Sequence, residues 1–241
     1  MATFNPAAIV YDDKINVLYR AEDKTGEMVI GGHTSRIGLA VSEDGMNYVR
    51  QSEPILYPKE DNQKKYEWPG GCEDPRIVET KDGDFILTYT QWDHDTPRLA
   101  VATSKDLKEW TKHGPVFENA YNGKYLNMES KSGAILSRLK DGKMIATKVN
   151  GKYWMYFGVP QIWIATSTDL INWTPVEDQN GVLMSVLSPR EGYFDSWLVE
   201  AGPPPVLTED GIMVFYNAGN NQETGNPNLG DRVIFWWAGI V

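Results

Sequence analysis

The 241-residue chain lacks several features that mark common protein classes. Its single cysteine, Cys72, excludes an internal disulfide, and its three histidines, His33, His94 and His113, show no metal-ligand spacing. The longest apolar run, residues 233–241, is about half the length that spans a membrane. No basic segment followed by an apolar one opens the chain, so we expect a cytoplasmic protein with no membrane partner.

Positive charge is scarce as well. The chain has 23 lysines and arginines against 33 aspartates and glutamates, which gives a net charge of −10. Such a chain offers no broad basic surface to a phosphate backbone, so nucleic acid is not an expected partner. Long stretches with a 3.6-residue period are missing, which argues against the crossover helices of an α/β fold. The sequence carries no signal for an oligomeric state.

What the sequence does contain is a repeat. Three segments, RIGLAVSEDGMNY (36–48), RLAVATSKDLKEW (98–110) and IWIATSTDLINW (162–173), share a serine, an aspartate two residues later and an aromatic residue four residues after that. The serines recur at intervals of 62 and 63 residues, at Ser42, Ser104 and Ser167. Each segment is typical of a β-hairpin whose turn is capped by serine and aspartate side chains.

Further strand-like runs precede each repeated segment, at 7–10, 15–20, 76–79, 85–90, 133–137 and 153–157. A fourth set begins at Pro205 and continues over 212–216 and 233–237. Four-stranded units that repeat around a centre are the blades of a β-propeller. We therefore predict an all-β fold in which residues 1–241 form one β-propeller domain with about four countable blades. A β-sandwich is the alternative, but it does not explain the period.

Polar groups stand where the first strand of each unit begins, at Asn5-Pro6, Glu73-Asp74-Pro75-Arg76, Glu129-Ser130-Lys131-Ser132 and Glu200-Ala201-Gly202-Pro203. Each alone fits a capped turn, but four equivalent positions favour a central pocket. Its expected carboxyl groups are Glu73, Asp74, Glu129, Asp195 and Glu200, and its expected cations are Arg20, Arg36, Arg76, Arg98 and Lys131. Crowded acids raise one another's pKa and arginines lower it, so a protonated acid and an ionised base can coexist. Glycosidic cleavage needs this combination.

At these residues the chain resembles glycoside hydrolase family 130 over nearly its whole length. The matching pieces are FNPAAI (4–9), VLYRAED (17–23), SRIGLAVSEDG (35–45), GGCEDPRIV (70–78), PRLAVATSKDLKEW (97–110), KSGAIL (131–136), IWIATSTDLINW (162–173) and GPPPVLTEDG (202–211). The resemblance implies a five-bladed β-propeller, so we expect either that this chain lacks part of its last blade or that its blades divide differently from the four units counted above. It also implies cleavage of β-mannosides with inversion, with or without phosphate. No cofactor is expected, because proton transfer and charge suffice for this cleavage.

The resemblance also implies roles for individual residues. Asp74, in the EDPR string, is the expected general acid, and it delivers its proton through a hydroxyl of the mannose ring. Asn5, Arg20 and Arg36 are expected to hold the sugar. Beside these implied roles, the strand-start positions lead us to expect that Glu129 and Glu200 activate water. The further expected substrate-binding residues are Arg76, Arg98, Lys131, Asp195 and a stacking tryptophan, Trp197 or Trp92.

Two departures from the family's phosphorylases favour hydrolysis. Glu200 lies in FDSWLVEAGPPP (194–205), where those phosphorylases carry KIGAG-like strings, and Asn217 replaces a histidine. Both changes remove groups that suit phosphate, and one adds a carboxylate. Arg98 and Lys131 resemble phosphate-side positions, so a β-mannoside phosphorylase with inorganic phosphate as co-substrate is the alternative. A carbohydrate-binding propeller without catalysis is the third hypothesis. Both β-1,2 and β-1,4 linkages fit the resemblance.

Overall fold

The regular structure of the chain is mainly antiparallel β-sheet. The computed structural model describes residues 2–22, 26, 27, 29, 31–230 and the backbone of 234–240. Its strands form three sheets, and only a short helix α1 (Lys64–Glu67) and a 3-10 turn η1 (Ala120–Gly123) interrupt them. The predicted all-β fold is confirmed, and the number of propeller blades stays a prediction. Within the described part of the chain, every helix is too short to cross a membrane.

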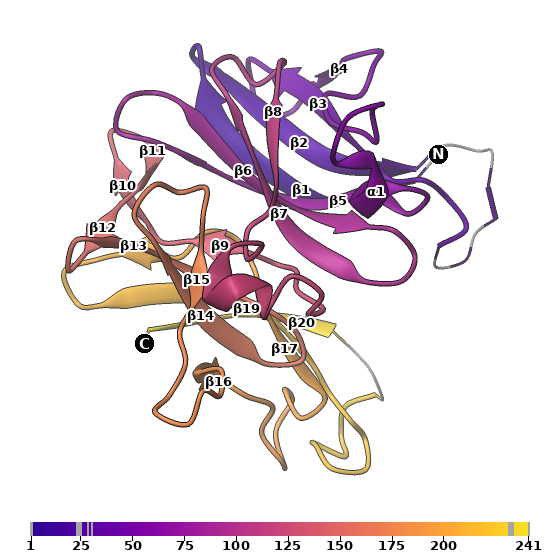
Figure 1. Ribbon diagram of the computed structural model, residues 1–241. Coiled ribbons are helices and arrows are strands. Elements are labelled where there is room, and N and C mark those ends of the chain that lie inside the picture. The colour runs from indigo at the N-terminus through magenta and orange to yellow at the C-terminus, as the bar shows by residue number, and fades with distance from the viewer. Residues whose placement is uncertain (1, 23–25, 28, 30, 231–233, 241) are drawn as a thin grey trace.

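The N-terminal half contains two four-stranded meanders. The first comprises β1 (Ala2–Tyr11), β2 (Lys14–Glu22), β3 (Arg36–Ser42) and β4 (Val49–Arg50). The second comprises β5 (Gly71–Glu79), β6 (Phe85–Trp92), β7 (Pro97–Ser104) and β8 (Thr111–Pro115). The first strands of the two meanders, β1 and β5, lie next to each other in space, in the upper half of Figure 1. Residues at the start of β1 and β5 can therefore meet.

The third unit is built on β13 (Lys152–Phe157). It also contains β9 (Ala134–Ile135), β12 (Lys148–Val149), β14 (Ile162–Ser167), β15 (Thr174–Pro175) and β16 (Ser185–Leu187). A hairpin of β10 (Ser137–Lys140) and β11 (Lys143–Ala146) leaves this unit after β9. The hairpin pairs with β5 on one side and with the fourth unit on the other, so it joins the second unit to the fourth.

The fourth unit corrects one detail of the sequence prediction. It consists of β17 (Leu198–Ala201), β18 (Val206–Leu207), β19 (Ile212–Gly219) and β20 (Ile234–Ile240), drawn in the lower part of Figure 1. Its first strand was predicted to begin at Pro205, but it begins at Leu198 and ends before three prolines at 203–205. Prolines lack the N–H group that a sheet needs, so they separate β17 from β18. Glu200 therefore lies inside the first strand.

The repeated serine and aspartate cap the hairpin turns as predicted. Ser42 accepts a 2.9 Å hydrogen bond from the backbone N–H of Gly45, and it donates a 3.0 Å bond to Asp44. The same pattern recurs at Ser104 and at Ser167. The aromatic residue that ends the repeat packs below the turn in the third unit, where Trp173 is fully buried. Local side-chain chemistry thus fixes the outer turns of three units.

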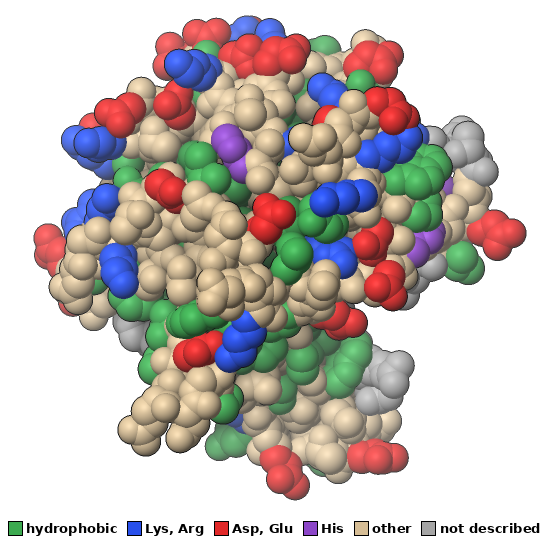
Figure 2. Space-filling model, viewed as in Figure 1, with side chains coloured by type: hydrophobic (Ala, Val, Ile, Leu, Met, Phe, Trp, Pro, Cys, Tyr) green, Lys and Arg blue, Asp and Glu red, His purple; other side chains and the backbone are tan. Residues whose placement is uncertain are grey.

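Three buried apolar clusters lie between and within the sheets. One surrounds Leu18 and Phe85 between the two N-terminal units, the second surrounds Phe157 and Trp173, and the third surrounds Val199 and Tyr216. Charged groups lie outside them: Figure 2 shows that lysine and arginine side chains on one face are separated by acidic and uncharged side chains. The apolar clusters hold the first strands rigidly, and these strands carry the site.

Candidate active site

The same backbone irregularity presents a polar side chain at the start of three units. Asn5, Asp74 and Ser132 have φ angles of 50°, 51° and 61°, in the left-handed region. The register of β1 with β2 shifts at residues 4–7, and the register of β5 with β6 shifts at 73–76. A bulge of this kind re-aims a side chain at a small cost in backbone energy, and asparagine and aspartate tolerate the conformation best. In the sequence, each of these left-handed positions is a polar residue directly before proline or glycine.

Asn5 and Asp74 line a pocket of about 520 Å³ between the first, second and fourth units. Its polar lining residues come from the starts of β1 and β5, from the segment before β9 and from β17 and β19: Asn5, Asp74, Arg76, Lys131, Glu200 and Asn217. Its apolar wall consists of alanines, prolines and Ile77. Five of these six polar residues belong to the predicted site. The sixth, Asn217, was noted only as a departure from the phosphorylases.

Asp74 is almost fully buried and contacts three donors. Asn5 donates a 2.6 Å hydrogen bond to its Oδ1 atom, and a guanidinium nitrogen of Arg20 lies 3.4 Å from the same atom. The Lys131 Nζ atom lies 4.0 Å from Oδ2. Burial raises the pKa of Asp74, but Arg20, Lys131 and the Asn5 hydrogen bond outweigh it, so the pKa lies below its ordinary value. Asp74 is therefore ionised in the free protein.

Glu200 is the second carboxylate of this pocket. Ser132 donates a short hydrogen bond to its Oε1 atom, and Asn217 donates a 3.3 Å bond to Oε2. The Lys131 ammonium group lies 3.4 Å from Oε1, so the same lysine stands between Glu200 and Asp74. Three donors around one carboxylate fix its orientation. The sequence prediction included Glu200 and Lys131 but omitted Ser132.

Arg76 takes a different position from the one expected of a substrate-binding cation. Its Nε atom donates a 2.7 Å hydrogen bond to the carbonyl of Gly202, and a terminal nitrogen donates a 2.6 Å bond to the carbonyl of Ala201. Burial lowers the pKa of Arg76, and the nearby carboxylates Glu200 and Asp74 oppose this. Arg76 lines the pocket, but its nitrogens tie β5 to the end of β17 and thereby position Glu200.

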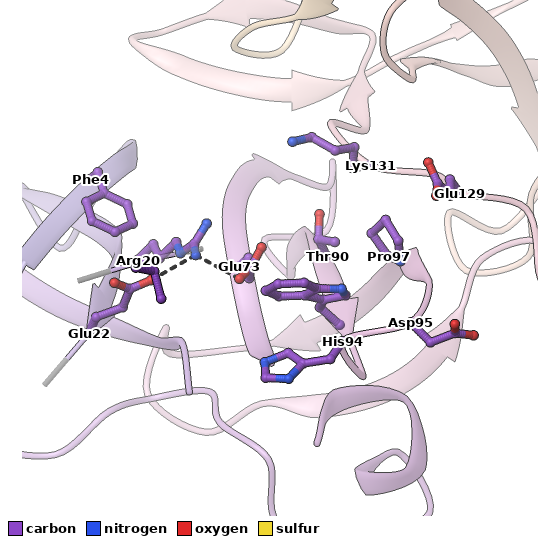
Figure 3. A pocket seen from close by; sticks show the side chains of 12 residues that line it. Phe4, Arg20, Glu22, Glu73, Thr90, His94, Asp95, Pro97, Glu129 and Lys131 are labelled. Atoms are coloured by element: carbon purple, nitrogen blue, oxygen red, sulfur yellow. Dashed lines mark hydrogen bonds and ion pairs between the residues drawn. The ribbon is translucent and has the colours of Figure 1, made fainter. Parts of the chain in front are cut away.

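A second pocket of about 660 Å³ also has Lys131 in its lining (Figure 3). Its lining residues come mainly from the first two units: Phe4, Arg20, Glu22, Val29, Glu73, Thr90, Trp92, His94, Asp95, Pro97, Glu129 and Lys131. Lys131 lines both pockets, so the two are adjacent. A ligand longer than one sugar ring can reach from one into the other.

Arg20 lies at the centre of a carboxylate cluster in the second pocket. One of its terminal nitrogens lies 2.8 Å from both Glu22 and Glu73, as the dashed lines in Figure 3 show. The Ser35 hydroxyl lies within hydrogen-bond distance of the same two carboxyl groups, at 3.2 and 3.1 Å. Burial raises the pKa of Glu73 to about 7, with Arg20 acting in the opposite direction and Asp74 adding to the rise. Glu73 was expected in the pocket without a role.

The far wall of the second pocket is aromatic. Thr90 and Trp92 lie on the same face of β6, because side chains two residues apart share a face, and Thr90 pairs with Glu73 across the strands. The ring centres of Trp92 and His94 are 4.6 Å apart. Among the described residues, the buried Thr90 hydroxyl has no hydrogen-bond partner. The aromatic surface suits the apolar face of a sugar.

The structure places the remaining predicted residues elsewhere. Arg98 is buried in an ion pair of 2.7 Å with Asp93, and Asp195 is buried in one of 2.8 Å with Arg190. Arg36 and Trp197 line neither pocket, and Glu129 lines the second pocket instead of the one that holds Glu200. The predicted residues that share a pocket with Lys131 are Asn5, Asp74, Arg76 and Glu200 in the first pocket and Arg20, Glu73, Trp92 and Glu129 in the second.

The chemistry of this arrangement is proton transfer and charge stabilisation. Across the described ranges, no three histidine, cysteine, aspartate or glutamate side chains are placed to hold a metal ion. Cys72 is fully buried, and burial raises the pKa of its thiol well above the ordinary value. Two carboxyl groups in one open pocket are typical of enzymes that cleave glycosidic bonds.

Comparison with known proteins specifies the family. The family model described as glycoside hydrolase 130, β-1,4-mannooligosaccharide phosphorylase, matches residues 1–226. The chain belongs to glycoside hydrolase family 130. The predicted resemblance is confirmed.

Solved structures and curated proteins of this family resemble the chain to different degrees. A glycosyl hydrolase from Bacteroides ovatus is 51% identical with a TM-score of 0.96, over 99% of this chain and 66% of that one. A second solved structure is 50% identical with a TM-score of 0.96, over 99% of this chain and 66% of that one. Its description reads "The GH130 family of mannoside phosphorylases contains glycoside hydrolases that target beta-1,2 mannosidic linkages in Candida mannan". The 1,2-β-oligomannan phosphorylase of Thermoanaerobacter sp. is 33% identical, over 91% of this chain and 65% of its own length. The chain thus spans about two thirds of these relatives.

Proposed function

We propose that this chain hydrolyses β-mannosidic bonds with inversion, with Asp74 as the general acid and Glu200 as the base that activates water. The observation that supports this best is the pair of carboxyl groups in one pocket, Asp74 and Glu200, each within 4.0 Å of Lys131. The strands that carry them are the first strands of two units. We further propose that these units are blades of a five-bladed propeller.

The two Lys131 distances set an upper limit on the separation of the carboxyl groups, and this limit admits inversion. The distances from Lys131 Nζ, 4.0 Å to Asp74 and 3.4 Å to Glu200, limit the distance between the two carboxyl oxygens to at most about 7.4 Å. Inverting glycosidases hold their carboxyl groups roughly 6.5–9.5 Å apart so that a water molecule fits opposite the leaving group. The arrangement is therefore compatible with attack by water from the side of Glu200.

Each neighbouring residue then has a role. Asn5 and Arg20 hold Asp74 and the sugar hydroxyl through which the proton passes. Ser132 and Asn217 hold Glu200 so that a free lone pair points at water. Lys131 stabilises both carboxylates until the substrate enters. Glu129 lies in the neighbouring pocket, so we assign the base to Glu200 alone.

Phosphorolysis is the second candidate, because several curated relatives, at 33% identity and below, are described as phosphorylases. A phosphorylase needs cations free to bind an anion. Here Arg98 is buried against Asp93, and the nitrogens of Arg76 donate to backbone carbonyls. Lys131 faces two carboxylates, which would repel phosphate. These contacts support hydrolysis. The 50% identity to the solved structure whose description names hydrolases of β-1,2 mannosidic linkages supports the β-1,2 linkage.

The test is to incubate the protein with β-1,2- and β-1,4-mannobiose, with and without inorganic phosphate, and to identify the products. We expect free mannose from the β-1,2 sugar without phosphate, and α-mannose as the first anomer by NMR. Mannose 1-phosphate formed only with phosphate would replace the hydrolase with the phosphorylase. Binding without any product would favour the carbohydrate-binding propeller.

A further inference from the structure

The carboxyl groups around Lys131 and Arg20 outnumber the cations that touch them. Arg20 contacts Glu22, Glu73 and Asp74, and Lys131 contacts Asp74 and Glu200. Four carboxyl groups thus have two cations as direct partners in a largely buried cluster, and the buried Arg76 adds a third positive charge near Asp74 and Glu200. Full ionisation would still leave one uncompensated negative charge there, which is costly at low dielectric. The cluster therefore retains a proton.

The proton belongs to Glu73 in the free protein. Asp74 has Arg20, Lys131 and Asn5 as partners, whereas Glu73 has the same Arg20 nitrogen that Glu22 uses and the shared Ser35 hydroxyl. Only 9% of Glu73 is exposed. The other charged or titratable groups that line its pocket are His94, Asp95, Glu129 and Lys131. None of these makes an ion pair with Glu73 among the described contacts.

This distribution creates a difficulty for the acid step. The proposed acid, Asp74, is ionised in the free protein, while a general acid must carry a proton when the bond breaks. The neighbouring carboxyl group holds that proton. Two interacting carboxyl groups titrate as a pair, and the state with one proton contains a fixed fraction in which the proton sits on either group.

We propose that Glu73 is a positioning residue for the acid step: through Arg20 and its charge, it keeps one proton on the Glu73–Asp74 pair and so keeps Asp74 available in its protonated form. The inference rests on the proposed function of Asp74. As long as the pair holds its single proton, a constant share of the molecules has ionised Glu73 and protonated Asp74. The alkaline limb of activity then follows the loss of the last proton from the pair, not the low pKa of Asp74 alone.

The first test is the pH profile of kcat/KM for Glu73→Gln, which keeps the size of the side chain. Without the partner carboxyl group, Asp74 retains a proton only at lower pH, because Arg20, Lys131 and Asn5 all favour its carboxylate. We expect the alkaline limb to move to lower pH by about one unit or more, so kcat/KM near neutral pH falls about tenfold or more while acid-side activity is kept. A merely structural role would lower activity at all pH values alike.

Two further variants define the effect. Asp95→Asn removes an exposed carboxylate of the same pocket that forms no ion pair with Arg20 in the described part of the chain, and it should leave the alkaline limb in place. Ser35→Ala removes a hydroxyl that stabilises ionised Glu73, so it should move the limb to higher pH, opposite to Glu73→Gln. An unchanged limb in Glu73→Gln, or the same shift in Asp95→Asn, would overturn the proposal.

A readout without activity separates this inference from the proposed function. The pKa of Glu73 is about 7 in the folded state and 4.5 in the unfolded state. The protonated side chain therefore stabilises the fold fully below pH 4.5, and this stabilisation is lost as the pH rises through about 7. The melting temperature of Glu73→Gln relative to the wild type should therefore increase between pH 5 and pH 8. A constant difference would show that Glu73 holds no proton. A wild type inactive on all mannosides, with this pH trend intact, would contradict only the proposed function.

Discussion

Asn5 and Asp74 lie 69 residues apart in the chain, yet a 2.6 Å hydrogen bond joins them at equivalent positions of neighbouring sheets. Both residues adopt a left-handed backbone conformation and both precede proline. The bond therefore connects the starts of β1 and β5 and fixes the carboxylate on which the proposed reaction depends. It also favours the ionised form of Asp74.

Removal of this bond should weaken both the fold and the site. Asn5→Gly keeps the left-handed backbone and removes the donor, which we expect to lower the free energy of unfolding by about 1 kcal/mol. Asn5→Ala loses the same bond and also places a Cβ atom in the left-handed region, which costs roughly 1–2 kcal/mol more. Urea unfolding of the two variants measures the difference. Equal stabilities would show that the bulge carries no strain.

The proposed acid predicts a loss that depends on the leaving group. Asp74→Asn preserves the side-chain shape and should lower kcat for unactivated β-mannosides by about 10²–10⁴-fold. Aryl mannosides with a good leaving group need less protonation, so their loss should be much smaller. Comparison of kcat for mannobiose and for a nitrophenyl mannoside checks this. Equal losses on both substrates would assign Asp74 to binding.

Asp74→Asn should also change how the stability of the fold depends on pH. The pKa of Asp74 is lowered in the folded state, so the ionised side chain contributes stability above its unfolded value of 3.8. This contribution disappears as the pH falls through the folded pKa. The stability advantage of the wild type over Asp74→Asn should therefore shrink between pH 5 and pH 2. An advantage that does not vary with pH would contradict the ionised carboxylate.

Much of the fold could be predicted from the sequence, because the repeat is local. A serine and an aspartate two residues apart determine each hairpin turn, whatever packs around it. The start of the fourth unit could not be placed in the same way. The fourth set was predicted to begin at Pro205, but the prolines at 203–205 mark the gap between β17 and β18.

Site membership was harder to predict, because it depends on which partner satisfies a charge. Arg98 and Asp195 have suitable side chains, but each forms an ion pair with a residue five positions away, Asp93 and Arg190. Such local pairs are visible in the sequence as opposite charges and argue against a free functional group. The importance of Ser132 depends on a contact with Glu200, 68 residues away, and only the fold reveals it.

The two glutamates predicted to activate water can now be distinguished. Glu200 lies in the pocket of Asp74 and is held by Ser132 and Asn217, whereas Glu129 is exposed at the side of the neighbouring pocket. Glu200→Gln should lower kcat by about 10²–10⁴-fold, and Glu129→Gln by less than about threefold. Azide added to Glu200→Gln should restore turnover, because a small anionic nucleophile needs no base. A larger loss in Glu129→Gln would reverse the assignment.

The aromatic wall of the second pocket predicts a dependence on the length of the substrate. Trp92 lies beside His94 at 4.6 Å, in the pocket that borders the proposed reaction centre at Lys131. If the sugar beyond the cleaved bond stacks on Trp92, Trp92→Ala should lower kcat/KM for mannobiose and mannotriose by about tenfold, mostly through KM. For an aryl mannoside with a small leaving group the loss should be smaller. Trp197→Ala is the matched control: Trp197 lines neither pocket, so its removal should leave both substrates equally affected. A uniform loss in Trp92→Ala would place the leaving sugar elsewhere.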